Sequence, residues 1–228
     1  MKKLIAVRDL CVKYDERAVL RNVSFEICEG DFICVVGANG SGKSTLIKAI
    51  LGLVRPAGGR VKLLNGLELR QLGYLPQETQ FEKDFPASVE EVVRSGALGR
   101  MKWRPFYTKA ERERAAECMR DLHIVKLAKR KIGELSGGQR QKVLLARAMM
   151  ASQKVLFLDE PSNNLDYKSK AEFYGILREL NAGGLTIVMI THDIDKHDLI
   201  GNKVLALRDR DVWFGETAKY LEVIHEHC

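Results

Sequence analysis

The first third of the chain is built of short apolar runs of strand length. Leu4 to Val12 and Val19 to Ile27 belong to a set of two or three predicted antiparallel strands, and the apolar run from Phe32 to Val36 predicts one buried strand. Ser44 to Val54 has helical spacing and ends at the proline and glycines of residues 55–59, which are typical of a helix stop. The pattern therefore predicts a strand, a glycine loop and a helix in direct succession.

Between about residues 76 and 145 the pattern becomes that of helices. Ser88, followed three residues later by Glu91, has the spacing of a capping box at a helix start. Residues 108–122 predict a second helix, which carries many charges. We interpret this segment as a helical insert.

Beyond residue 145 strands and helices alternate again. Val155 to Leu158 and Thr186 to Ile190 are apolar runs typical of central strands in a parallel sheet that is covered on both faces. The other predicted elements are helices at Val143 to Met150, Lys168 to Leu180 and Asp195 to Ile200, and a closing hairpin of Val204 to Leu207 with Val212 to Phe214. The predicted fold class is α/β, with a mainly parallel sheet and helices, an N-terminal antiparallel β subdomain and a helical subdomain.

The 228 residues carry a formal net charge of +7, and the excess of positive charge is concentrated in the helical insert. From Arg94 to Lys131 there are 12 Lys/Arg and 4 Asp/Glu, which gives this segment a charge of +8. A solvated helix face explains such a run, and so does a surface that faces membrane headgroups or an acidic partner. Composition alone leaves nucleic acid, nucleotide phosphate and an anionic membrane as candidate partners.

We expect a chain that is neither exported nor membrane-spanning. Its longest apolar segments have only strand length, and charge returns within five residues of Lys3, which leaves no stretch for a secretory signal. The five cysteines are irregularly spaced and include no Cys-x-x-Cys pair, so we expect neither a disulfide framework nor a zinc knuckle. Free thiols without an export signal fit a reducing cytosol.

The glycine loop after the predicted buried strand matches the pattern G-x-x-x-x-G-K-[ST] of a P-loop NTPase core. Its glycines let successive backbone N–H groups point at phosphate oxygens, and the helix start adds the positive end of its dipole. Lys43 would reach the β- and γ-phosphates of a nucleotide, and Ser44 would offer its hydroxyl to Mg²⁺. The residues expected to bind nucleotide here are Gly37, Ala38, Asn39, Gly40, Ser41, Gly42, Lys43, Ser44 and Thr45.

Two acids follow the apolar run of residues 155–158. Because sites in α/β sheets lie at the carboxyl ends of strands, Asp159 and Glu160 are expected beside the phosphates. Asp159 would hold Mg²⁺, directly or through water, and Glu160 would be the general base that polarises a water for attack on the γ-phosphate. Alone, such a pair is a solvated strand end, whereas with the glycine loop it indicates nucleotide hydrolysis.

A second candidate anion-binding element is Leu135-Ser136-Gly137-Gly138-Gln139, which stands before a predicted helix. Serine at an N-cap with glycines behind it exposes N–H groups and a hydroxyl, although an ordinary helix cap has the same residues. One chain needs only one phosphate-binding end for one nucleotide. We therefore infer a head-to-tail pair in which Ser136, Gly138 and Gln139 of each chain cover the nucleotide of the other.

In their order these motifs resemble the nucleotide-binding subunits of ATP-binding cassette (ABC) transporters, and the resemblance covers essentially all 228 residues. It implies that Tyr14 stacks on adenine, that Gln77 contacts Mg²⁺ and signals to a membrane partner, and that His192 contacts the γ-phosphate. Ser162 to Asp166 resembles the loop that communicates across the dimer. The cofactors implied are ATP and Mg²⁺, the catalytic residues Glu160, His192 and Lys43, and the Mg²⁺ ligands Ser44, Gln77 and Asp159.

The resemblance also implies partners. ATP would close two subunits face to face, and hydrolysis would reopen them. The segment from Gln77 to about Tyr107 would dock a cytoplasmic helix of a separate integral membrane permease, which works with an extracytoplasmic substrate-binding protein. We expect a single ABC ATP-binding domain over residues 1–228, peripheral at the cytoplasmic face of the membrane, with a core of residues 1–76 and 146–228 and a helical subdomain of residues 77–145.

A finer resemblance concerns the cargo. Phe85 to Gly96 is similar to the F-P-x-[ST]-V-x-[ED]-V-V-x-x-G run in ATPases of bacterial zinc, manganese and iron importers, so we expect import of a divalent metal ion, zinc or manganese. ATPases for iron chelates or vitamins have related segments, and Asn163-Asn164 departs from the small residues that many metal-type members carry there. The tail of residues 225–228 offers His and Cys ligands for a metal, or is a frayed terminus.

Two other classes stay open. An ABC ATPase that works on ribosomes or DNA would exploit the basic charge, but such relatives usually carry two cassettes in one chain or a long coiled-coil insertion, and the sequence contains neither. We therefore expect no nucleic acid partner. A two-subunit exporter, in which a separate chain supplies the membrane spans, remains an alternative to an importer.

Overall fold

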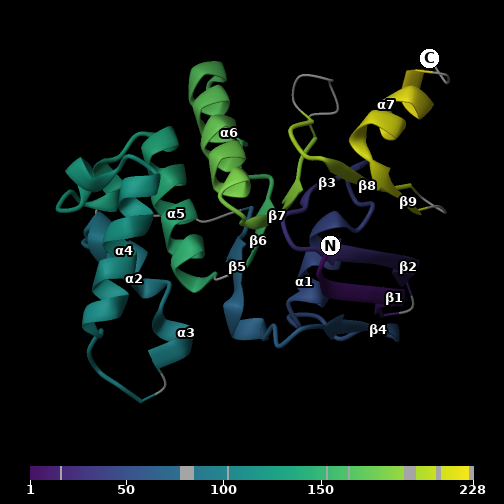
Figure 1. Ribbon diagram of the computed structural model, residues 1–228, viewed down its shortest axis with the longest axis horizontal. Helices are drawn as coiled ribbons and strands as arrows, with labels where there is room; N and C mark the ends of the chain where they lie inside the picture. Colours follow the sequence, from purple (N-terminus) through teal and green to yellow (C-terminus); the bar gives the residue numbers. More distant parts are fainter. Residues whose placement is uncertain are drawn as a thin grey trace. The chain divides into compact units, whose positions relative to one another are not determined.

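The computed structural model describes residues 1–15, 17–77, 85–101, 103–152, 154–163, 165–192, 199–208 and 212–225. The chain divides into two compact units, the first made of Met1–Leu69 with Asn181–Cys228 and the second of Arg70–Leu180 (Figure 1).

An antiparallel sheet opens the first unit. β1 (Lys3–Tyr14) lies between β2 (Arg17–Cys28) and β4 (Gly58–Leu63), and both pairs are antiparallel (Figure 1). The predicted strands are confirmed, but the third strand, β4, follows the buried strand instead of preceding it. Its first residues are the glycines that we interpreted only as a helix stop. At Gly59, where φ is +73°, a Cβ atom would lie 2.2 Å from the carbonyl oxygen of Asp9, so β4 approaches β1 closely because that residue is glycine.

Parallel strands form the rest of the first unit. β3 (Phe32–Gly37) pairs in parallel with β7 (Thr186–Ile190) on one side and with β8 (Lys203–Leu207) on the other, and β9 (Val212–Glu216) closes an antiparallel hairpin with β8. Nearly all residues of β3 and all of β7 are buried, as their continuous apolar runs predicted. Most of the helix predicted at residues 195–200 lies outside the described residues, and its last two residues, 199 and 200, are not helical.

Two helices complete this unit. α1 (Lys43–Ile50) ends four residues earlier than predicted, because the chain turns at Gly52, whose φ is +70°. α7 (Thr217–His225) was not predicted. Tyr220 anchors it, with only 5% of its surface exposed and its ring centroid 5.1 Å from that of Trp213 on β9.

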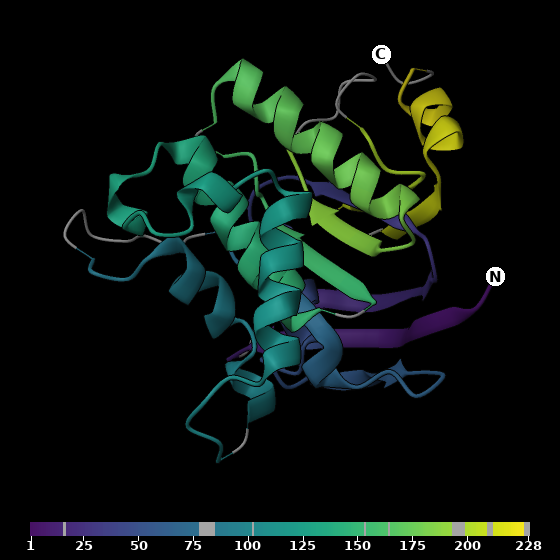
Figure 2. The ribbon, with the colours of Figure 1, turned by 60° about the vertical axis from the view of Figure 1, so that its left-hand side comes forward.

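The second unit combines a parallel strand pair with helices. β5 (Leu72–Leu75) pairs with β6 (Val155–Asp159), and the helices are α2 (Val89–Ser95), α3 (Leu98–Met101), α4 (Lys109–Asp121), α5 (Gly137–Ala151) and α6 (Tyr167–Ala182). Helices α2, α4 and α5 pack on one another (Figures 1 and 2). The strand β5 was not predicted. With mainly parallel strands, covering helices and an antiparallel β sheet, the predicted fold class is confirmed.

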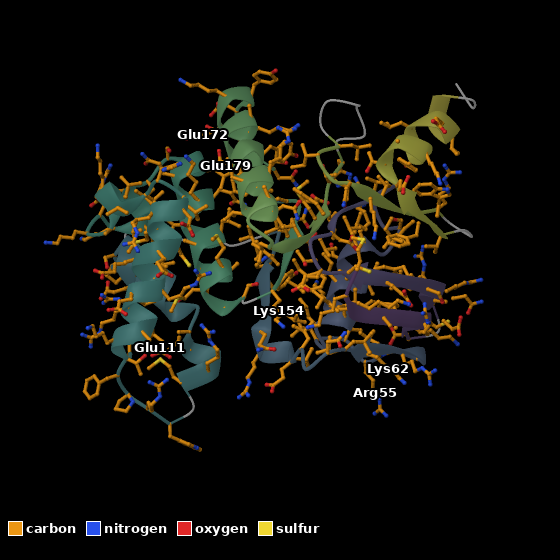
Figure 3. The ribbon with its side chains drawn as sticks, viewed as in Figure 1. Arg55, Lys62, Glu111, Lys154, Glu172 and Glu179 are labelled. Carbon is orange, nitrogen blue, oxygen red and sulfur yellow. The ribbon has the colours of Figure 1, made fainter. Side chains whose placement is uncertain are left out.

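Capping boxes start α2, α4 and α5 in this unit. The Ser88 side chain accepts from the backbone N–H of Glu91 at 3.3 Å, and Glu91 Oε2 accepts from the backbone N–H of Ser88 at 2.8 Å, as predicted. α4 begins with the same arrangement at Thr108 and Glu111, the latter labelled in Figure 3. A hydrogen bond from Arg104 and then the cap itself lower the pKa of Glu111 to about 2. These capping boxes stabilise the starts of α2 and α4, which carry part of the basic segment of residues 94–131.

Candidate nucleotide-binding site

The glycine loop joins β3 to α1 in the first unit. Gly37, Gly40 and Gly42 have φ values of +151°, +80° and +96°. A Cβ atom on Gly37 would lie 2.4 Å from the carbonyl oxygen of Leu207, and one on Gly42 would lie 2.7 Å from Leu20 Cδ2. Both the backbone conformation and the available space therefore require glycine at residues 37 and 42. These glycines let the loop turn tightly, so that its backbone leads directly into the start of α1.

Lys43 is the first residue of α1 and has only 5% of its surface exposed. Its Nζ donates to the carbonyl oxygens of Gly37 at 3.0 Å and Ala38 at 2.9 Å, so the amino group bends back over the loop. Ser41 Oγ is buried in this loop without a hydrogen-bond partner among the described residues. A buried cation, a buried hydroxyl and a helix start together fit an anionic phosphate ligand.

The other loop residues lie around this centre. Ala38 and Asn39 are exposed, and Ser44 and Thr45 are half-buried in the first turn of α1. The backbone N–H groups in the first turn of a helix point out of the helix end, which is the general reason that helix starts bind anions.

Two further predicted residues belong to the first unit. The N–H of Thr191, directly after β7, donates to the carbonyl oxygen of Val35 at 3.1 Å, so His192 follows at the same sheet edge where β3 runs into the glycine loop. Tyr14 ends β1 and is 46% exposed, which leaves its ring accessible to a base. His192 is also exposed.

The two predicted acids lie at the end of β6 in the second unit. Asp159 is 2% exposed and Glu160 is 9% exposed. Because β5 and β6 are parallel, Gln77 reaches the same edge, and its Nε2 donates to Glu160 Oε2 at 2.7 Å. The structure thus joins Gln77 to the candidate base, while the glycine loop and His192 are described in the other unit.

Tyr74 and Asn163 contact these acids and were missed as site residues. The Tyr74 hydroxyl donates to Asp159 Oδ2 at 3.5 Å, and burial, followed by the negative charge of Asp159, raises the pKa of Tyr74 to about 12. Tyr74 therefore remains a donor at neutral pH. Asn163 Nδ2 donates to the same Glu160 oxygen as Gln77. The only sequence signal for Asn163 was its departure from the small residues of the resembling family.

The acid edge has oxygen ligands of the kind that Mg²⁺ prefers. The buried Asp159 carboxylate receives a hydrogen bond from Tyr74, and the Gln77 amide lies on the same edge. Ser44, the third predicted ligand, stands in the first unit at the start of α1. By their chemistry, the oxygens at the acid edge are of the kind that fit a magnesium ion.

The Ser136 element starts α5. Ser136 Oγ accepts from the N–H of Gln139 at 3.3 Å, and Gln139 Oε1 accepts from the N–H of Ser136 at 3.2 Å, which is a capping box. Packing also favours glycine at residue 138, because a Cβ atom there would lie 3.0 Å from Ser169 Oγ on α6. The ordinary cap is therefore present, and Ser136 itself is exposed at the beginning of a 15-residue helix.

A groove of about 510 Å³ lies within the second unit, between the end of β5, the α2–α3 turn and α5. Its apolar lining includes Leu75 and Leu98, and its cations include Arg100 and Arg147. On the segment after α3, Trp103 is fully exposed and Phe106 is 76% exposed. Large exposed apolar side chains are typical of a surface that binds another protein or a membrane.

The site geometry predicts that Lys43→Ala loses nucleotide affinity. The buried ammonium forms charge-assisted hydrogen bonds of about 1.5–3 kcal/mol, so the Kd for a nucleoside triphosphate, measured by calorimetry, should rise roughly 10- to 100-fold. Lys48→Ala is the matched control, because Lys48 is an exposed lysine of the same helix. Equal affinity in the two variants would contradict the assignment of the phosphate site.

Comparisons with known proteins give the family. Residues 20–163 match the family described as ABC transporter. The manganese transport system ATP-binding protein MntB of Halalkalibacterium halodurans is 35% identical, over 96% of this chain and 88% of that protein. The zinc uptake system ATP-binding protein ZurA of Listeria monocytogenes is 33% identical over the same shares. An inward-facing structure described as a metal-chelate type ABC transporter superposes with a TM-score of 0.86 at 31% identity, over 96% of this chain and 86% of that one.

The family match spans the glycine loop, the Ser136 element and the acid pair. Within the described residues, no helix has the length and apolar character needed to cross a bilayer. The chain therefore belongs to the ABC transporter family and is an ATP-binding, ATP-hydrolysing subunit of that family.

Proposed function

We propose that this ATPase energises the import of a divalent metal ion, zinc or manganese. The observation that carries the proposal is that relatives named for manganese transport and zinc uptake match 96% of the chain, well beyond the nucleotide motifs. The metal-type run from Phe85 to Gly96 supports it independently. In this proposal the chain is peripheral at the cytoplasmic face of a membrane, where it serves an integral permease that receives cargo from an extracytoplasmic binding protein.

The proposed mechanism assigns each group a task. The N–H groups of the glycine loop and Lys43 bind the β- and γ-phosphates of ATP, while Tyr14 stacks on adenine. Ser44, Gln77 and Asp159 would hold Mg²⁺, which would supply positive charge to offset the negative charge of the phosphates. Glu160 accepts a proton from the attacking water, and His192 contacts the γ-phosphate.

We further propose that two copies of the chain complete each site. Ser136, Gly138 and Gln139 of one copy would cover the ATP bound by its head-to-tail partner. The exposed start of the long helix α5 supports this role, because its N–H groups and dipole favour an anion. Hydrolysis would then depend on dimerisation.

The groove of the second unit supports permease docking. Its lining from Ser95 to Arg100 falls inside the segment from Gln77 to Tyr107 that the resemblance assigned to this contact, and β5 and α5 supply the other walls. Trp103 and Phe106, on the segment that follows α3, are also exposed apolar side chains. We propose that a cytoplasmic helix of the permease lies in this groove. We also propose that residues 77–145 form the helical subdomain and that residues 1–76 and 146–228 form the core.

The docking proposal predicts that Leu98→Asp weakens the complex. Leu98 lines the groove and is 56% exposed, so an aspartate would remove apolar contact area and place a charge against an apolar partner. We expect at least a roughly tenfold loss of permease in copurification, since a cost of about 1.4 kcal/mol is tenfold in affinity. Val125→Asp, at a 49% exposed apolar residue outside the groove, should copurify like the wild type. Equal losses in both variants would refute the groove as the docking site.

Uptake tests the cargo directly. Vesicles that contain the ATPase with its copurified permease and binding protein should take up labelled zinc or manganese when ATP is supplied, and Glu160→Gln should abolish the uptake because the proposed base is removed. Uptake of an iron chelate alone would instead favour the alternative suggested by the metal-chelate type structure. Intact ATP hydrolysis without metal uptake, or stimulation of hydrolysis by nucleic acid, would contradict the metal proposal.

A further inference from the structure

A tight turn follows β6 and brings Asn163 back to Glu160, where the turn begins. The backbone N–H of Asn163 donates to the carbonyl oxygen of Glu160 at 3.2 Å. Glu160 stands at φ +49°, a conformation that long side chains rarely adopt and that persists only where the surroundings hold it. The same residue pair is joined a second time, since Asn163 Nδ2 donates to Glu160 Oε2.

The turn is anchored outside this pair. The N–H of Leu165 donates to the carbonyl oxygen of Ser162 at 3.2 Å, and Ser162 Oγ lies 2.9 Å from the hydroxyl of Tyr174. Tyr174 belongs to α6 and is 3% exposed. Ser162 and Leu165 are therefore each hydrogen-bonded, and the amide side chain of Asn163 is directed at the Glu160 carboxylate.

Two amides then hold one carboxylate oxygen. Gln77 Nε2 approaches Glu160 Oε2 from the end of β5 at 2.7 Å, and Asn163 Nδ2 approaches it from the turn. A flexible glutamate has several rotamers, and a general base works only when its lone pair meets the proton within hydrogen-bond distance. Two donors on one oxygen restrict the plane of the carboxylate.

We propose that Asn163 is a positioning residue that orients Glu160 for proton abstraction from the attacking water. This rests on the proposed role of Glu160 as the base. A small residue such as alanine or serine has no amide that could donate from this position, and aspartate would set a second carboxylate against the first. In this proposal Asn163, which differs from the small residues of many metal-type members, has a positioning function.

The test compares steady-state ATP hydrolysis by the full-length wild type, Asn163→Ala and Ser162→Ala. Asn163→Ala should lower kcat roughly 10- to 100-fold, because small misplacements of a reacting group have effects of this order, while the KM for ATP changes less than about twofold. Ser162→Ala removes the anchor to Tyr174 but spares the Asn163 amide, so its loss of kcat should be smaller. Wild-type kcat in Asn163→Ala, or an equal loss in both variants, would overturn the proposal.

A second comparison separates this role from a contact across the dimer. If Asn163 acts only through Glu160, adding Asn163→Ala to Glu160→Gln should leave the ATP-dependent dimer of that variant unchanged in gel filtration. Loss of that dimer on adding Asn163→Ala would assign the residue to dimer assembly and overturn the proposal. Wild-type hydrolysis by Glu160→Gln itself would instead remove Glu160 as the base, a failure of the proposed function that is visible without any change at residue 163.

Discussion

The close approach of backbone to backbone at the glycine loop is the constraint on which the site depends. Gly37 lies so near the end of β8 that a methyl group there would sit 2.4 Å from a carbonyl oxygen. That closeness exists because β3 is held between β7 and β8 in a fully paired parallel arrangement. The buried strand therefore fixes where the loop begins, and the loop fixes where Lys43 and the start of α1 stand. A phosphate site of this kind requires little motion of its own before it can bind an anion.

In the second unit, strand pairing likewise fixes the positions of the residues around Asp159 and Glu160. The parallel pair of β5 and β6 brings Gln77 level with Glu160, and the turn that follows adds Asn163. Both units thus present preorganised polar groups at carboxyl ends of strands, where sheets of this class place their sites. The groove proposed for permease docking is lined by Leu75, the last residue of the same strand β5, and by Pro76. A partner seated there would contact the segment that carries Gln77, which offers a short physical route between docking and the candidate base.

The elements predicted well were those with a strong local signal. Apolar runs identified β3, β6 and β7, and the spacing of Ser88 and Glu91 identified the start of α2. The missed strand β4 begins with two glycines, which locally resemble a helix stop, and only its pairing with β1 makes it a strand. Among the site residues, motif positions were recognisable by resemblance. Contacts such as those of Tyr74 and Asn163 depend on tertiary pairing and turn geometry, which local periodicity does not encode.

The most direct test of the account is whether ATP assembles two copies of the chain around composite sites. Glu160→Gln should keep ATP bound without hydrolysing it, and light scattering with gel filtration in the presence of Mg²⁺ and ATP should then show a dimer of this 25.7 kDa chain that reverts to monomer when ATP is removed. A species that stays monomeric while ATP is demonstrably bound would contradict the composite site.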